Sequence, residues 1–124
     1  MDQEYGDGRE ETTPFSEAEL VYLSQHQLAR VATSSADGQP HVVPVVYEFD
    51  GKYAYFSGWN LRKSLKFKNI LINPKVAIVV DDLKTVSPWK PRGIELRGRA
   101  EVLRERGSYC VRVTIDSKRS WGLD

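Results

Sequence analysis

Residues 28–58 read LARVATSSADGQPHVVPVVYEFDGKYAYFSG, and this stretch decides the fold. Its apolar residues alternate with polar ones or form short β-branched runs, which is the pattern of β-strands. ADGQ and DG are turn sequences, and the second favours a tight hairpin. The stretch therefore predicts three antiparallel strands over residues 28–35, 40–49 and 52–58, almost without loops between them.

Three more strands are expected downstream. Residues 74–82 form a continuous apolar run, residues 93–103 alternate, and residues 108–116 again have a strand pattern. Before the first strand, FSEAELVYLSQHQ predicts a short helix, because Ser16 and Glu19 have the spacing of a capping box. Six short strands and two short helices predict a mostly β fold, a six-stranded antiparallel barrel.

The 124 residues suffice for one domain. Residues 1–14 are polar and acidic and are interpreted as a flexible N-terminal arm, which leaves residues 15–124 as the folded domain. No apolar run approaches the roughly 20 residues of a membrane helix, and the acidic N-terminus has no signal-peptide pattern. We therefore expect a soluble, cytoplasmic protein with no membrane partner.

The chain has more apolar strand surface than one small barrel can bury. HVVPVV at residues 41–46 and VAIVV at residues 76–80 are apolar on both strand faces, whereas a barrel interior takes only one face. A homodimer that covers the second face is the simplest expectation.

The sequence lacks the usual patterns of metal and nucleophile chemistry. HxxxH, CxxC and GxSxG arrangements are absent. Asp81 and Asp82 are adjacent, so on a strand they point to opposite faces and cannot act as a carboxylate pair. His41 and the lone Cys110 are interpreted as structural residues. We expect no metal site and no catalytic side chain, so any demanding chemistry belongs to a cofactor.

Cations are concentrated in the stretch LRKSLKFKN, although the formal net charge is only +1, so an anion site has to be local. Treated as one helix, this stretch places Arg62, Lys66 and Asn69 on a common face with Lys63 beside it, while Lys68 falls among the apolar positions. Such a face at a helix start suits a phosphate. The alternative is an ordinary solvated helix surface.

A second unusual stretch surrounds Trp89, which stands between two prolines and is followed by Lys90 and Arg92. This stiff loop is suited to stacking on a planar ring or to holding an acidic tail. Equally, Trp89 could fill a dimer interface. The same two interpretations hold for Trp121 in the closing SWGLD.

Several stretches resemble a known family. DGQPHVVPVVYEFDGKYAYFSG followed by KSLKFKNILINPKVAIVVDD is similar to the pyridoxamine 5′-phosphate oxidase-like superfamily of flavin- and deazaflavin-binding split barrels. PWKPRGIELRGRAEV and SWGLD resemble the branch that depends on the deazaflavin coenzyme F420. The resemblance covers the chain from Phe15 onward. The loop between Gly58 and Ser64 differs from the pyridoxamine phosphate oxidases proper, and their C-terminal substrate segment is not found, so vitamin B6 oxidation is not expected.

The resemblance implies a homodimer of six-stranded split barrels with two cofactor sites at the interface. Lys66 would bind the cofactor phosphate, with Lys68 and Asn69 in the same motif. The resemblance also implies that the backbone of Val43, Pro44 and Val45 faces the ring system of the cofactor. Ser57 would lie near the phosphate-bearing chain of the cofactor.

The leading hypothesis is an oxidoreductase that passes hydride from reduced coenzyme F420 to a small unsaturated molecule. Arg62 and Lys63 would help Lys66 to hold the phosphate and an acidic tail, while Trp89 and Arg92 would border the substrate opening. The alternative is an FMN-binding flavoprotein, either a flavin reductase or a pyridoxamine phosphate oxidase-like enzyme. A third hypothesis is a non-enzymatic barrel that binds single-stranded nucleic acid through Trp59, Trp89 and the lysines, which the near-zero net charge disfavours.

Overall fold

The computed structural model describes residues 14–123. In chain order, its helices and strands are α2 (Glu17–Gln25), β1 (Leu28–Ser34), β2 (Pro40–Phe49), β3 (Tyr53–Phe56), the 3₁₀ helix η1 (Leu61–Lys63), α3 (Leu65–Ile72), β4 (Lys75–Thr85), β5 (Lys90–Glu105) and β6 (Ser108–Trp121). Apart from Pro14, the arm expected over residues 1–14 lies outside the described residues.

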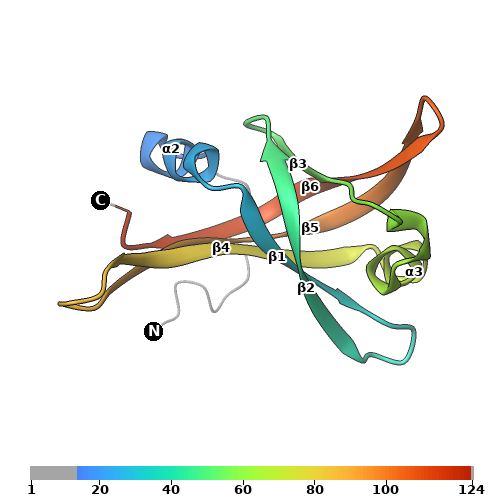
Figure 1. The fold of residues 1–124 in the computed structure, drawn as a ribbon, viewed down its shortest axis with the longest axis horizontal. Helices are drawn as coiled ribbons and strands as arrows, with labels where there is room; N and C mark the ends of the chain where they lie inside the picture. Colours follow the sequence, from blue (N-terminus) through green and yellow to red (C-terminus); the bar gives the residue numbers. More distant parts are fainter. Residues whose placement is uncertain (1–13, 124) are drawn as a thin grey trace.

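The six strands close into one barrel in the order β1-β2-β3-β6-β5-β4, and every neighbouring pair is antiparallel (Figure 1). The predicted six-stranded antiparallel barrel is confirmed. β5 and β6 are longer than expected. β5 begins at Lys90, where it pairs with β4, and continues to Glu105, while β6 continues to Trp121 opposite Gly93. The Lys- and Arg-rich ends of these strands carry no apolar alternation that would mark them in the sequence.

Alternation along the strands places one face of each strand inside the barrel. Val31, Ile78, Ile94, Val111 and Val113 are at most 2% exposed. Burying one such side chain contributes about 1.5–3 kcal/mol, so this shared interior stabilises the barrel.

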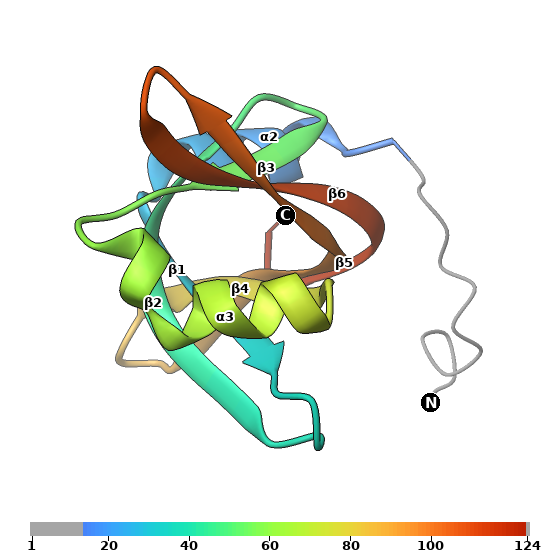
Figure 2. The ribbon, with the colours of Figure 1, turned by 90° about the vertical axis from the view of Figure 1, so that its right-hand side faces the viewer.

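The two α-helices lie at opposite ends of the barrel (Figures 1 and 2). At the start of α2 the Ser16 hydroxyl accepts the Glu19 N–H at 3.1 Å, and the Glu19 carboxylate accepts the Ser16 N–H at 2.9 Å. The predicted capping box is therefore confirmed. α2 buries Tyr22 and Leu23 against one end, and α3 buries Phe67 against the other.

The outer surface of β1 and β2 carries exposed apolar side chains. Leu28, Val42 and Val46 are 52%, 61% and 65% exposed, and Leu28 lies directly opposite Val46 across the strand pair. This is the second apolar face that the sequence assigns to a homodimer. The homodimer itself stays a prediction.

Within residues 14–123, every helix is too short or too polar to cross a lipid bilayer. The cytoplasmic location expected from the sequence stays a prediction.

Candidate functional site

The cation-rich stretch forms two short helices rather than one. η1 ends at Lys63, and Ser64 has extended backbone angles (φ −78°, ψ 156°) before α3 begins. The Ser64 hydroxyl accepts the Phe67 N–H at 3.3 Å and so caps α3. Because a new helix starts here, Arg62 does not continue the helical face of Lys66.

Asn69 also departs from the expected face. It is 4% exposed, and its side-chain amide donates to the hydroxyl of the buried Thr33 on β1 at 3.0 Å. Asn69 thus ties α3 to the barrel, while Lys66 is half-buried and Lys68 is exposed. The expectation of one surface shared by Arg62, Lys66 and Asn69 is wrong.

The cations of η1 and α3 have no carboxylate partner among the residues that the structure describes. The Arg62 guanidinium instead lies 5.9 Å from the ring centre of Tyr109 on β6. Elsewhere in the barrel arginines pair with acids, as Arg99 does with Asp116 at 2.8 Å. The positive charge around α3 is therefore not neutralised within residues 14–123.

The first turn of α3 offers backbone donors beside these cations. Ser64 accepts two of the first N–H groups, that of Phe67 with its hydroxyl and that of Lys68 with its carbonyl at 3.3 Å. The N–H groups of Leu65 and Lys66 precede the first intrahelical bond and have no acceptor in the described part of the chain. A phosphate at this point would meet both N–H groups and the Lys66 ammonium.

β2 has an open edge at the same end of the barrel. β3 pairs with only Tyr47–Phe49 of β2, whereas β1 pairs with β2 along Pro40–Val46. Val43–Val45 therefore have a strand neighbour on one side only, and half of the backbone groups there face away from the ladder. Ser57 directly follows β3 where this edge begins, so the predicted residues of β2 and Ser57 lie near one another.

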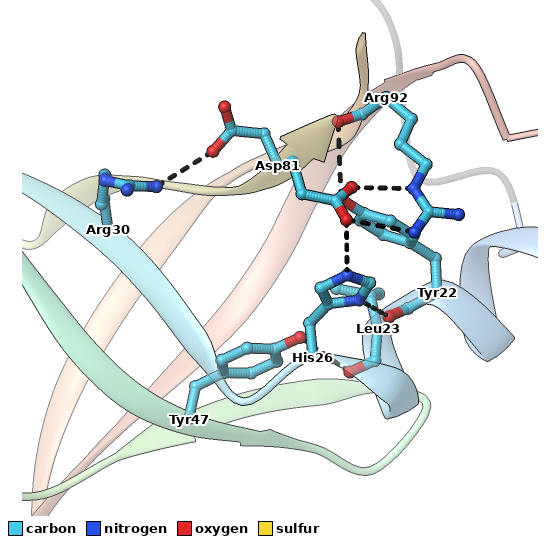
Figure 3. Close-up of polar contacts among 8 residues, drawn as sticks. Tyr22, Leu23, His26, Arg30, Tyr47, Asp81 and Arg92 are labelled. Atoms are coloured by element: carbon cyan, nitrogen blue, oxygen red, sulfur yellow. Dashed lines mark hydrogen bonds and ion pairs between the residues drawn. The ribbon is translucent and has the colours of Figure 1, made fainter. Parts of the chain in front are cut away.

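The other end of the barrel contains a dense polar cluster around Asp82. The Arg92 guanidinium donates to both Asp82 oxygens, at 2.8 and 3.1 Å, and the Tyr22 hydroxyl donates to one of them at 2.8 Å. His26 Nε2 lies 3.4 Å from the other oxygen. Figure 3 shows Arg92 from β5 converging with Tyr22 of α2 and with His26, the residue that follows α2. The cluster joins α2 to the barrel.

Hydrogen bonding sets the ionisation of this cluster. The hydrogen bonds from Arg92, and then those from Tyr22 and His26, hold the pKa of Asp82 well below its usual range, against a smaller opposing effect of burial. Burial, together with the Asp82 carboxylate, raises the pKa of Tyr22. Asp82 is thus an ionised, fully engaged acceptor. Asp81 points the other way and pairs with Arg30 at 3.0 Å, which confirms that the two aspartates do not form a carboxylate pair (Figure 3).

The predicted site residues fall into two groups that one chain does not bring together. Lys66 and its neighbours lie at the α3 end, whereas Arg92 belongs to the β4–β5 hairpin, which projects from the end that carries α2 (Figure 1). Trp89, in the turn of that hairpin, is 68% exposed. Trp59 is 93% exposed and follows β3 toward η1, so Trp59 and Trp89 form no common stacking surface in one chain.

Trp121 packs on the backbone of its neighbour strand. A Cβ atom added at Gly93 would lie 2.7 Å from the Trp121 ring, so only glycine fits opposite this side chain. The Arg119 guanidinium lies 5.7 Å from the same ring. In the single chain, Trp121 therefore closes the end of the β5–β6 pair.

Sequence reasoning missed two groups of residues that the fold assembles. Tyr109 contacts Arg62 and Phe67 across more than 40 positions, and Tyr22 reaches Asp82 across 60. No local spacing links such positions, because the barrel closure alone brings them together. His41, expected to be structural, has a buried Nδ1 atom without a hydrogen-bond partner within the described chain.

Three surface hollows within residues 14–123 are lined by none of the predicted site residues, although Thr33, the hydrogen-bond partner of Asn69, lines one of them. The first, of about 420 Å³, is lined mainly by β1, β4 and β5, and the second, of about 560 Å³, by β6, the β2–β3 turn and residues around the start of α2. The third, of about 570 Å³, is lined mainly by β2 and the end of α2. Among residues 14–123, no three His, Cys, Asp or Glu side chains come together as metal ligands. Burial raises the pKa of the half-buried Cys110 thiol, which makes this thiol a poor nucleophile.

Known proteins resemble this chain in sequence and in fold. The sequence profile of the pyridoxamine 5′-phosphate oxidase family matches residues 15–115. The chain belongs to this family. It is therefore a member of an oxidoreductase family that binds flavin-type cofactors.

One relative is similar along nearly the whole chain. The 5a,11a-dehydrotetracycline/5a,11a-dehydrooxytetracycline reductase of Streptomyces rimosus is 35% identical over 121 residues, which cover 90% of this chain and 85% of the relative.

Two solved structures share the fold. A conserved hypothetical protein of Mycobacterium tuberculosis has a TM-score of 0.73 and 22% identity, with 92% of this chain and 88% of the other covered. A protein named F420 reductase has a TM-score of 0.69 and 22% identity, with coverage of 85% and 98%.

Proposed function

We propose that the chain is a reductase that binds the reduced deazaflavin coenzyme F420 and catalyses hydride transfer from it to a small unsaturated organic molecule. The observation that carries the proposal is the α3 end of the barrel, where an open edge of β2 adjoins cations without carboxylate partners among residues 14–123. A planar cofactor with a phosphate uses both features, the backbone edge for its ring and the cations for its charge.

The relatives support the reaction class. The Streptomyces relative is named for dehydro substrates, and a dehydro compound contains an additional double bond for a reductase to saturate. The protein named F420 reductase has the same barrel. We therefore favour a conjugated carbon–carbon double bond as the acceptor.

Each side chain at the α3 end has a role in this proposal. Lys66 and the free N–H groups at the start of α3 hold the phosphate, and Arg62 and Lys63 meet the remaining negative charge. The backbone of Val43–Val45 aligns the ring by hydrogen bonds along the open edge of β2. The bound coenzyme supplies the hydride. The protein contributes by placing donor and acceptor within reach and by excluding water.

A homodimer through the outer face of β1 and β2 belongs to this proposal. Exposed apolar side chains that lie together mark an interface, and Val46 is 65% exposed at the end of this strand pair, opposite Leu28. A second copy would also let a partner's β4–β5 hairpin approach the α3 end. Trp89 and Arg92 could then border a substrate opening that one chain does not form.

The dimer is tested by replacing Val46 with Glu. We expect light scattering to give twice the 14.1 kDa chain mass for the wild type and the single mass for Val46→Glu, because burying a carboxylate in an apolar interface is costly. Val21→Glu is the control, since Val21 is 44% exposed but lies on α2. A wild-type protein that is monomeric at high concentration would rule out this interface.

The cofactor is tested by two fluorescence titrations, one with coenzyme F420 and one with FMN. FMN also has a planar ring and a phosphate but lacks an acidic tail. We expect saturable binding of the deazaflavin and much weaker binding of FMN. Tight FMN binding without deazaflavin binding would replace the proposal by an FMN-dependent flavin reductase or oxidase.

A further inference from the structure

Two arginines at the α3 end share one aromatic ring. The guanidinium carbon of Arg62 lies 5.9 Å from the ring centre of Tyr109, and that of Arg104 on β5 lies 5.6 Å from the same ring centre. Tyr109 itself packs edge-on against Phe67 of α3, with ring centres 5.5 Å apart. The ring therefore holds two guanidinium groups in place beside the first turn of α3.

The positive charges of Arg62 and Arg104 are not neutralised by the contact with Tyr109. An aromatic ring attracts a cation but carries no net charge, so Tyr109 cannot neutralise two arginines. Neither Arg62 nor Arg104 makes an ion pair with an acidic side chain anywhere in residues 14–123. Glu105, which directly follows Arg104 in the sequence, forms no ion pair there either.

A neighbouring arginine on the same sheet shows the complete arrangement. Arg112 lies 4.7 Å from the ring centre of Tyr53 and also donates to the Glu101 carboxylate at 2.9 Å. The guanidinium groups of Arg62 and Arg104 have the ring without the carboxylate. What the Tyr109 cluster lacks is therefore an acidic group.

The position of the cluster defines which anion fits. Arg62 lies on η1, which Ser64 alone separates from α3, so the cluster adjoins the phosphate position proposed at Lys66. Guanidinium groups bind carboxylates through paired N–H donors. We propose that Arg62 and Arg104, held by Tyr109, form a second subsite that binds a carboxylate-bearing extension of the cofactor beyond its phosphate. This inference rests on the proposed function and adds Arg104 and Tyr109 to the residues that select a tailed cofactor over FMN.

The test compares two deazaflavin ligands. One is coenzyme F420 with its glutamate tail, and the other is the same deazaflavin ending at the phosphate. For Arg104→Gln we expect about fivefold weaker binding of the tailed form, the size of an exposed ion pair, and less than a twofold change for the tail-less form. Arg62→Gln should show the same selectivity for the tailed form.

Arg112→Gln is the matched control. It removes the same charge from the same sheet, but that charge is already paired with Glu101. We expect Arg112→Gln to change neither dissociation constant by more than about twofold, because Glu101 already occupies the guanidinium group of Arg112. Thermal melting of all variants checks that the barrel is intact.

The outcomes separate this inference from the proposed function. Equal wild-type affinity for the tailed and tail-less forms, with Arg104→Gln unchanged on both, would overturn the subsite and leave the proposed function standing. An equal loss on both forms would also overturn it, since Arg104 would then not act through the tail. No binding of either form by the wild type would overturn both proposals.

Discussion

The two ends of the barrel differ in whether their charged side chains have partners of opposite charge. At the α2 end, Asp82 accepts hydrogen bonds from Arg92 and Tyr22, and Glu19 pairs with Lys118 at 2.9 Å. At the α3 end, the cations of η1 and α3 have no acidic partner within residues 14–123. The charges around Asp82 and Glu19 are matched internally, whereas the cations of η1 and α3 are available to a ligand.

The difference identifies which charges stabilise the fold. Lys118 and Glu19 are 12% and 8% exposed, and a desolvated charge has to be paired inside the protein. Although burial alone would raise it, the pKa of Glu19 is lowered by hydrogen bonds from Lys118, Ser120 and the Ser16 backbone. Arg62, Lys63 and Lys68 are exposed, so water can solvate them until an anion binds. Substitutions at the α2 end should therefore reduce stability, and those at the α3 end should reduce binding.

The largest stability effect is expected for Asp82→Ala. Loss of the Asp82 carboxylate leaves Arg92, Tyr22 and His26 without their common acceptor at a partly buried position. We expect the free energy of unfolding in urea to fall by about 2–3 kcal/mol.

The adjacent Asp81 provides the control for this prediction. Its pair with Arg30 is exposed on both sides, at 48% and 52%, and such pairs contribute about 0–1 kcal/mol. Asp81→Ala should therefore cost less than about 1 kcal/mol. Equal losses for the two aspartates would show that the Asp82 cluster does not hold α2 to the barrel.

The second prediction concerns Lys66→Ala at the α3 end. We expect deazaflavin binding to weaken by about 1.5–3 kcal/mol, the range for a hydrogen bond to a charged group, with the free energy of unfolding almost unchanged. Lys84→Ala, at an exposed position near the end of β4, should affect neither quantity. An unchanged dissociation constant for Lys66→Ala in fluorescence titration would remove Lys66 from the phosphate site.

The sequence predicted the fold well because its signals are local. The alternation in residues 28–58, the capping box at Ser16 and the hairpin at Asp50 each act within a few residues, and each is present in the structure. The strand ends beyond residues 103 and 116 were missed, since there the ladder pairing continues without apolar alternation.

The candidate site was less predictable, because its geometry depends on contacts distant in sequence. The sequence analysis treats the cation-rich stretch as one helix, but Ser64 caps α3 and so separates Arg62 from Lys66. Asn69 is expected on a face shared with Arg62 and Lys66, but the closed barrel places it against Thr33. Whether these residues bind a cofactor stays a prediction.

The smallest predicted effect is the pH dependence of stability, which also distinguishes the two ends. The folded chain holds the pKa of Asp82 below its unfolded value of 3.8, chiefly through the hydrogen bonds from Arg92. This contribution is fully present above that unfolded value. It is lost as the pH falls through the acid range toward the folded pKa, because the unfolded chain takes up the proton first. We therefore expect the urea midpoint to fall between about pH 5 and pH 2.

Asp82→Asn should flatten part of this dependence, because the substituted side chain does not titrate. Asp116→Asn is the matched control: its pKa is also lowered, by hydrogen bonds from Arg99, but that pair is about half exposed. Exposure screens the interaction, so Asp116→Asn should flatten the curve less. Urea midpoints of the three proteins across this range give the comparison directly. If the control flattened the curve as much as Asp82→Asn, the acid sensitivity would come from carboxylates in general, and the matched charges of the α2 end would have no special part in stability.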